Sequence, residues 1–323
     1  MTTENIKKSR KSVCTIGPVW SVNILLAFFI SLTFYITLPM ETQKTLQIPK
    51  GSIGSIISQL SKEGYDIGII DSTILRFLGT PKSGWIDIGE TTLNRIDFLY
   101  KLTSAKTMIH KITLIPGETS IIFFENIAKK LNLNASTLQT EYNNLSIYPE
   151  AGIYADTYHV PYGIKEKNLI SFLLKVSNNK YQKLSNNAYG DYNTSKWLHT
   201  LIIASIIQKE AANTKEMPLI SSVIYNRLKK NMRLQMDGTL NYGKYSHVKV
   251  TPERIKTDLS SFNTYKHKGL PKSPIGAVSF RAINAALNPS KTNYLYFMRN
   301  KDGVHDFTDT FKKHRKNIKK LSK

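Results

Sequence analysis

Hydrophobic residues are distributed unevenly along this chain, and the first concentration of them lies near the N-terminus. No charged residue occurs from Ser12 to Met40. Within that stretch, the segment 16–38 is long enough to cross a hydrocarbon core as a helix, which takes about 20 residues. Lysines and an arginine precede it at positions 7–11, and positive charge beside a span stays on the cytoplasmic side. The pattern predicts a basic cytoplasmic tail, 1–15, followed by a transmembrane helix, 16–38.

A cleaved signal peptide is an alternative interpretation of this segment. Signal peptides end in small residues at their cleavage site, whereas this run ends in Thr37-Leu38-Pro39-Met40. A buried core helix is a second alternative, but such a helix rarely avoids charge over so many positions. We therefore expect an uncleaved single-pass anchor. In a bacterium this would be an anchor in the inner (cytoplasmic) membrane, with the rest of the chain in the periplasm.

Beyond the span, short apolar strands alternate with amphipathic helices. The segments 46–60 and 113–131 both indicate a strand, a turn that contains proline and glycine, and a helix capped by serine or threonine. Helical patterning then covers about 35 residues from Thr194, with a break near Asn213. We predict an α+β fold with a small module at 41–110, a larger mixed α+β domain at 111–311 and a basic C-terminal helix or tail at 312–323.

One carboxylate occupies an unusual place in this pattern. On a helix through the apolar run 201–212, Glu210 would lie on the same face as Ile203, Ile206 and Ile207. Burial disfavours a charged carboxylate and raises its pKa, which is what a general acid needs near neutral pH. The alternative is that Glu210 lies past the buried part of its helix and meets water or a lysine.

The charge of the chain points to an anionic partner. The formal net charge is +22, of which +12 remains on residues 41–311 after the N-terminal cluster and the C-terminal tail are set aside. A membrane anchor would export this basic body away from nucleic acid, so we expect none as a partner. With Cys14 as its one cysteine, the chain cannot form an internal disulfide framework or a cysteine-based zinc module.

Several polar clusters follow Glu210, and they alternate with aromatic residues. Amide and hydroxyl groups can bind sugar hydroxyls, while flat aromatic rings can pack on sugar faces. The same residue types are also common in turns. We take the following residues as candidates for substrate binding: Asn226, Arg227, Gln235, Asp237, Thr239, Asn263 and Tyr265.

These motifs, taken together, resemble the YceG-like endolytic murein transglycosylases, membrane-anchored enzymes that cut peptidoglycan glycan strands. The resemblance runs from about Ile48 to His314 and is dense after Ser205. Motifs that match in order and spacing are Ser205-Ile206-Ile207-Gln208-Lys209-Glu210, Asn226-Arg227-Leu228, Met232-Arg233-Leu234-Gln235, Asn263-Thr264-Tyr265, Gly269-Leu270-Pro271 and Tyr294-Leu295-Tyr296-Phe297. The resemblance puts Glu210 on the catalytic position and makes the 41–110 module LysM-like, which implies glycan contact.

The resemblance also implies a mechanism. A single glutamic acid protonates the bond between MurNAc and GlcNAc within a strand, and its carboxylate then deprotonates the MurNAc 6-hydroxyl, leaving 1,6-anhydro-MurNAc ends. Such an enzyme needs no metal or other cofactor, and we expect none. Its partners would be peptidoglycan glycan strands, the membrane and peptidoglycan synthases, and it would end nascent strands.

Two alternatives to lytic transglycosylation remain open at this point. A hydrolysing muramidase would use Asp237 as a second carboxylate beside Glu210. A non-catalytic cell-wall binding or scaffold protein would use the basic body and the LysM-like module without cutting the glycan.

Some positions depart from the family pattern. Ala155 stands where proline is usual, Lys272-Ser273 replaces a common Pro-Gly, and Ala277-Val278-Ser279 replaces Asn-Pro-Gly. We expect these to be loop positions that affect the shape of the cleft. We expect His305 and His314 to pack in a C-terminal strand and helix, with no role as metal ligands.

Overall fold

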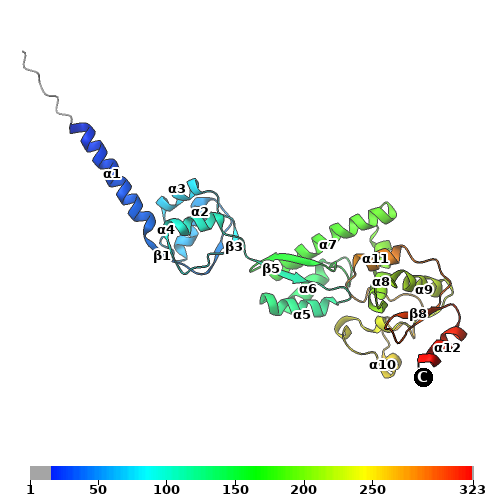
Figure 1. Ribbon diagram of the computed structural model, residues 1–323. Coiled ribbons are helices and arrows are strands. Elements are labelled where there is room, and N and C mark those ends of the chain that lie inside the picture. Colours follow the sequence, from blue (N-terminus) through cyan, green and yellow to red (C-terminus); the bar gives the residue numbers. More distant parts are fainter. Residues whose placement is uncertain (1–15, 322–323) are drawn as a thin grey trace, which may run out of the picture. The chain divides into compact units, whose positions relative to one another are not determined.

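The protein is described here from a computed structural model, which covers residues 16–321 (Figure 1). The predicted tail 1–15 and the last two residues lie outside the described residues. The chain divides into two compact units, Met1–Met108 and Ile109–Lys323. The protein is a mixture of helices and small sheets, which confirms the predicted α+β class.

The first helix, α1 (Ile16–Thr37), coincides with the predicted span to within one residue. Its part Val19–Thr37 is 19 residues long, apolar enough to cross a membrane, and not buried by the rest of the protein. Thr33 donates a hydrogen bond from Oγ1 to the carbonyl of Phe29, and Thr37 does the same to Thr33. The hydroxyls of these two threonines therefore have partners inside the helix and do not require water.

A small module follows α1 in the first unit. Its elements are β1 (Pro39–Glu41), β2 (Thr45–Ile48), α2 (Ile53–Lys62), α3 (Ile69–Leu78), β3 (Gly84–Asp87), β4 (Thr92–Asn94) and α4 (Arg95–Ser104). Strands β1 and β4 pair antiparallel, as do β2 and β3. Leu46, Ile56, Leu60 and Phe98 are buried in the core that these elements share. Helix α4 starts at Arg95, directly after residues 92–94 pair with β1.

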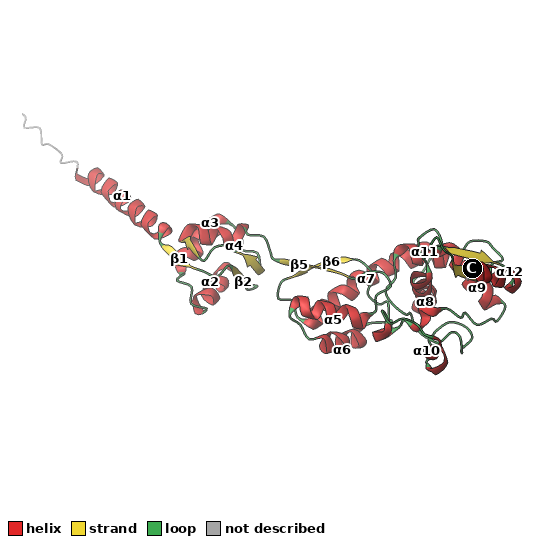
Figure 2. Ribbon diagram, turned by 60° about the horizontal axis from the view of Figure 1, so that its bottom comes forward, coloured by secondary structure: helices red, strands yellow, loops and turns green. Residues whose placement is uncertain are grey.

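The larger unit begins with a two-stranded sheet and three helices. Its first elements are β5 (Ile109–Thr113), α5 (Ser120–Leu131), α6 (Ala135–Leu145), β6 (Thr157–Pro161) and α7 (Glu166–Tyr189). Strands β5 and β6 pair antiparallel (Figure 2). Phe123, Phe124, Leu138 and Leu173 are buried in the core between them and the helices.

The second part of this unit is built around α8. Its elements are α8 (Thr194–Glu210), α9 (Met217–Lys229), the 3₁₀ helices η1 (Asp237–Leu240) and η2 (Gly243–Tyr245), α10 (Pro252–Thr257), α11 (Phe280–Leu287), β7 (Tyr296–Arg299), β8 (His305–Thr308) and α12 (Phe311–Leu321). The interruption between α8 and α9 confirms the break expected near Asn213.

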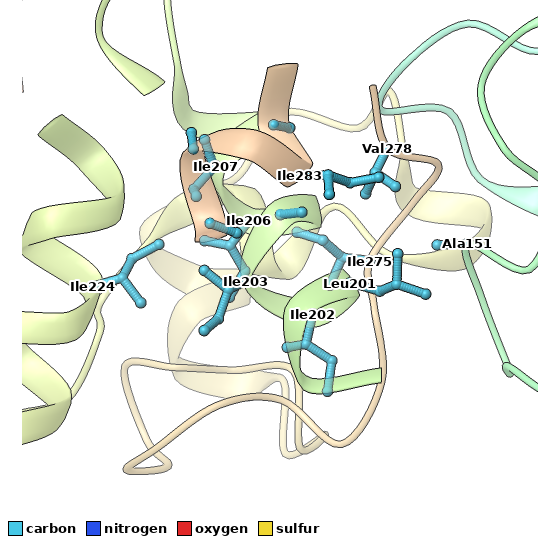
Figure 3. Packing of buried hydrophobic residues seen from close by; sticks show 14 of the residues in the cluster. Ala151, Leu201, Ile202, Ile203, Ile206, Ile207, Ile224, Ile275, Val278 and Ile283 are labelled. Atoms are coloured by element: carbon cyan, nitrogen blue, oxygen red, sulfur yellow. The ribbon is translucent and has the colours of Figure 1, made fainter. Parts of the chain in front are cut away.

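Helix α8 is the centre of the core in this part of the protein. Residues 200–207 are all buried, and their neighbours include Ile224 of α9 and Ile283 of α11 (Figure 3). Over residues 200–207 the helix is therefore buried on every side, and its burial is not confined to the one face expected for Ile203, Ile206 and Ile207. Glu210, at the end of α8, is covered by the chain that meets the helix there, including Gly238 of η1.

The C-terminal basic segment is a helix that packs on the protein. The ring of His314 in α12 stacks on Tyr296 of β7 at a centroid distance of 5.3 Å, and Phe311 lies 5.8 Å from the same ring. The basic helix or tail predicted at 312–323 is thus a helix over 311–321, and it packs against β7 of the larger unit.

Candidate active site

Glu210 is the last residue of α8, and its carboxyl group lies against the backbone of Gly238 in η1. The N–H of Gly238 donates a hydrogen bond of 2.7 Å to Oε1 of Glu210. A Cβ atom at position 238 would lie 2.8 Å from that oxygen and 2.8 Å from Cβ of Lys209, closer than real Cβ atoms approach. Glycine at this position therefore allows the backbone to reach the carboxyl group.

The surroundings of Glu210 change its acidity. Burial raises the pKa of Glu210 to about 7, and the nearby negative charge of Asp237 adds to the rise. The Gly238 N–H and the positive charge of Arg227 act in the opposite direction on this pKa. Because the pKa lies close to neutrality, the carboxyl group can both donate and accept a proton near pH 7.

The residues just before Glu210 hold the end of α8 in place. Oγ of Ser205 accepts a hydrogen bond of 3.1 Å from the backbone of Ile275. Oε1 of Gln208 accepts one of 2.7 Å from Oγ of Ser279, the residue that caps α11. These contacts join the last turns of α8 to a chain segment about 70 residues away, so Glu210 sits on a rigid support.

Lys209 faces a polar cluster that the sequence analysis did not identify. Its ammonium group donates a hydrogen bond of 2.9 Å to Oγ of Ser246, and burial lowers the pKa of Lys209 while Glu118 and Glu150 raise it. Glu118 lies 2.8 Å from Nε2 of His247. The carboxylates of Glu118 and Glu150 therefore lie near Lys209, the residue before Glu210.

Glu150 is held in this cluster by the start of α5. Its carboxylate accepts hydrogen bonds from the backbone N–H of Ser120, at 3.1 Å, and from Oγ of Ser120, at 2.9 Å. Burial raises the pKa of Glu150, and the N–H of Ala151 and the Ser120 donors oppose that rise. The sequence did contain a signal for this polar cluster. Glu118 follows a Pro-Gly turn before a helix, and Glu150 opens the family-related stretch that contains Ala155.

Three of the predicted substrate-binding residues lie on accessible surface around η1. The hydroxyl of Tyr265 donates a hydrogen bond of 2.7 Å to Oδ1 of Asp237. Burial raises the pKa of Tyr265, and Asp237 and the charge of Glu210 add to that rise. Asp237 and Gln235 are exposed. Gln235 has a φ of 48°, in the left-handed region that non-glycine residues seldom occupy. Substrate contact by these residues stays a prediction.

The side chains of Asn226 and Arg227 are bonded to backbone carbonyls. Nδ2 of Asn226 donates to the carbonyls of Thr292, at 2.8 Å, and Tyr294, at 2.9 Å. The guanidinium of Arg227, which is 7% exposed, donates to Leu295 at 2.6 Å and to Leu234 at 2.5 Å. These contacts fix the segment before β7 to α9 and indicate a structural role, with Arg227 also acting electrostatically on Glu210.

Asn263 and Thr239 are buried as well, and both bond to neighbouring chain. Nδ2 of Asn263 donates to the carbonyls of Ile255 and Asp258, both at 2.8 Å. Oγ1 of Thr239 donates to the carbonyl of Met236 at 2.7 Å. These side chains shape the loops around η1, so any effect they have on a substrate would pass through those loops.

No group of side chains in the described part of the chain, 16–321, is suited to hold a metal ion. The two histidines considered earlier have structural partners. Nδ1 of His305 lies 2.7 Å from Oε2 of Glu216, and His314 stacks on Tyr296.

Residues 277–279, which depart from the family pattern, lie next to the last turns of α8. Ala277 and Val278 are buried, and the backbone of Ala277 exchanges hydrogen bonds of 2.7 Å with Gly117 and Glu118. Ser279 bonds to Gln208 of α8. Residues 277–279 do form a loop before α11, as expected, and this loop packs against the end of α8. Their effect on the shape of the cleft stays a prediction.

Comparison with known proteins connects this arrangement to characterised relatives. Over 117 residues the chain is 43% identical to the endolytic murein transglycosylase of Bacillus subtilis, and over 103 residues it is 37% identical to that of Streptococcus pneumoniae. These matches cover 36% and 30% of this chain, and 32% and 19% of the two relatives. The chain thus matches about a third or less of the length of these relatives.

A solved structure and a family model cover far more of the chain. The crystal structure of a YceG-like protein from Listeria monocytogenes superposes with a TM-score of 0.56 at 26% identity, over 85% of this chain and 99% of that one. The model of the YceG-like family matches residues 46–320. The motif resemblance is therefore confirmed, and the chain belongs to the YceG-like family.

Proposed function

We propose that this protein is an endolytic lytic transglycosylase that cleaves the MurNAc–GlcNAc bond within peptidoglycan glycan strands. The observation that carries the proposal is the carboxyl group of Glu210, whose pKa is raised to about 7 and whose Oε1 is fixed by the N–H of Gly238. The names of the two curated relatives support the choice of murein as substrate.

In the proposed reaction, Glu210 acts first as an acid. Protonated Glu210 gives its proton to the glycosidic oxygen, and the bond from that oxygen to C1 of MurNAc breaks. The carboxylate that remains takes the proton of the MurNAc 6-hydroxyl, whose oxygen bonds to C1 and closes the 1,6-anhydro ring. The proton lost in the first step is thereby recovered, and no water is consumed.

This reaction suits a site with one catalytic carboxyl group. Because the nucleophile belongs to the substrate, the second step is intramolecular and needs no positioned water. The Gly238 N–H stabilises the ionised form of Glu210 in mid-reaction, while burial favours the protonated form at the start. Asp237, Tyr265 and Gln235 are the proposed contacts to the sugar hydroxyls, because they lie at accessible positions around η1.

Hydrolysis by a pair of carboxylates is the competing chemistry. Asp237 is the partner it would need, and its charge does act on Glu210. However, Asp237 accepts the hydroxyl of Tyr265, and this bond fits a positioning role better than that of a free nucleophile. The two reactions leave different products, since hydrolysis gives reducing ends and transglycosylation gives anhydro ends.

We further propose that α1 anchors the protein in the inner membrane, with the N-terminus in the cytoplasm and the two units in the periplasm. The apolar length of Val19–Thr37 and the basic residues at 7–11 support this orientation. An anchored enzyme would meet glycan strands close to where synthases extend them, which suits a role in ending nascent strands.

Digestion of purified sacculi tests the proposal. The full-length protein should release fragments with 1,6-anhydro-MurNAc ends, as identified by mass spectrometry. Glu210→Gln should release none, while Glu125→Gln, at an exposed position of α5, should match the wild type. Fragments with reducing ends would identify a muramidase, and binding to sacculi without any release would identify a non-catalytic wall protein.

A further inference from the structure

Helix α3 of the small module exposes apolar side chains on one face. Ile69 and Phe77 are 88% exposed and Ile70 is 55% exposed. The opposite face is buried, since Asp71 and Leu75 have no exposed surface. Large apolar residues gathered on one side of a short helix usually mark an interaction surface.

This exposed face adjoins α1. An apolar cavity of about 590 Å³ lies between the two helices, and it is lined by Phe28, Ser31, Leu32 and Tyr35 of α1 and by Ile70, Thr73, Ile74 and Phe77 of α3. The two helices therefore present one continuous apolar surface with a furrow along it.

A buried polar cluster holds the two helices together. The hydroxyl of Tyr35 donates a hydrogen bond of 2.8 Å to Oδ2 of Asp71. The guanidinium of Arg95, from α4, lies 3.0 Å from the same oxygen and donates to the Tyr35 hydroxyl at 3.1 Å. Because the side chains of Asp71 and Arg95 are almost fully buried, removing a partner from this cluster would leave a buried charge without compensation, which is costly. The position of α3 beside α1 is thus well determined.

The length of α1 fixes the depth at which α3 lies. At 1.5 Å per residue, the 19 apolar residues Val19–Thr37 measure about 28 Å, close to the thickness of the hydrocarbon core. The residues that face α3, from Phe28 to Tyr35, occupy the C-terminal half of that length. If α1 spans the bilayer, residues beside this half lie at the depth of the leaflet from which α1 emerges.

We propose that α3 is a membrane-embedded helix whose Ile69, Ile70 and Phe77 face contacts the acyl chains of that leaflet. This proposal rests on the proposed anchoring by α1. Interfacial helices typically lie about 5–10 Å deep with their apolar face toward the chains. Lipid acyl chains fill the furrow between α1 and α3, so the module is held against the membrane along two helices instead of one.

The polar groups of α3 suit this placement. Oγ1 of Thr73 donates to the carbonyl of Ile69 at 3.2 Å, so the hydroxyl on the lipid-facing side has a partner within the helix. Arg76 is exposed at the margin of the apolar face, where its long side chain can reach the lipid head groups.

Depth-dependent fluorescence quenching tests the proposal in the full-length protein. The background is Cys14→Ser, which removes the one native cysteine. Single variants Phe77→Cys, Phe28→Cys and Gln47→Cys carry an NBD label, and each protein is reconstituted in phosphatidylcholine–phosphatidylglycerol vesicles with or without brominated acyl chains. Gln47 is the matched control, because it is exposed on β2, and β2 and β3 lie on the side of the module away from α1 (Figures 1 and 2).

The labels at positions 28 and 77 should both shift their emission to the blue and lose fluorescence to brominated chains, while the label at 47 should do neither. If the label at 28 is quenched but the label at 77 behaves like the one at 47, the proposal for α3 is overturned. The proposed anchoring by α1 would still hold in that case. Absence of quenching at 28 would overturn the anchor, and this proposal with it. Retained sacculus cleavage by each labelled protein shows that it is folded.

Discussion

Oε1 of Glu210 accepts a hydrogen bond of 2.7 Å from the backbone N–H of Gly238, across 28 positions of sequence. The contact joins the end of the buried helix α8 to the first turn of η1. It gives the carboxyl group one fixed donor in surroundings that otherwise favour the neutral acid. A site of this kind can keep a glutamic acid protonated near neutral pH and still stabilise its conjugate base.

Replacing Gly238 by alanine should disrupt the site more than the fold. The new Cβ would stand 2.8 Å from Oε1 of Glu210 and from Cβ of Lys209, so the carboxyl group must move and its hydrogen bond is lost. A displaced catalytic group typically costs about 100-fold in rate, which kinetics on sacculi would measure. As a control, Gly54→Ala should leave activity unchanged and stabilise α2 by about 0.5–1 kcal/mol, since no atom lies within 4 Å of that Cβ. Unchanged activity in Gly238→Ala would contradict the role given to this contact.

The rate of glycan cleavage should fall on the alkaline side of neutrality. The proposed reaction starts from protonated Glu210, whose pKa is about 7, so kcat/KM should decline as the pH rises through that value. A pH–rate profile on a soluble glycan substrate would show this limb. A rate that stays constant to pH 9 would argue against Glu210 as the acid.

Asp237→Asn should move this alkaline limb to lower pH and preserve most of the activity. The negative charge of Asp237 raises the pKa of Glu210, so its removal makes Glu210 a stronger acid. The amide can still accept the hydroxyl of Tyr265, which keeps the loop in place. If the substitution abolished cleavage outright, Asp237 would be a catalytic partner, as the muramidase mechanism requires.

Glu210→Gln should raise the stability of the folded protein at neutral and alkaline pH. The pKa of Glu210 rises from an ordinary 4.5 to about 7 on folding. The favourable contribution of the neutral acid is therefore complete below pH 4.5 and is lost as the pH rises through 7. Relative to the wild type, the glutamine variant should be at most about 3 kcal/mol more stable at pH 8 and show little gain at pH 4. Urea unfolding of the larger unit at the two pH values would reveal the difference.

Asn226→Asp should destabilise the larger unit without direct involvement of the substrate. The substitution replaces the amide donor to the carbonyls of Thr292 and Tyr294 with acceptor oxygens, at a cost of about 2–4 kcal/mol. Asn144→Asp, at an exposed position of α6, should change stability by less than about 0.5 kcal/mol. A destabilised variant whose remaining folded fraction keeps its KM would support the structural role. An unchanged stability with a raised KM would instead favour the substrate-binding role first expected.

The sequence was enough to locate the apolar span, the two strand–turn–helix segments and the candidate catalytic residue. The uncharged run predicted α1 to within one residue, because a long apolar segment with no charge has few alternatives. The spaced motifs predicted the family and pointed to Glu210. Sequence patterns carry this information because hydrophobic periodicity and motif spacing are local properties of the chain.

Only the tertiary structure decided what surrounds each of these residues. The periodicity placed Glu210 on one apolar face of α8, but α9, α11 and the loop before α11 bury residues 200–207 on every side. Gly238, Glu118 and Glu150 meet the end of α8 only after folding, and Asn226 and Arg227 bond to carbonyls near β7. Burial, hydrogen bonding and pKa depend on groups that are close in space and distant in sequence. The sequence therefore determined which residue is the candidate acid, and the packing determined its acidity.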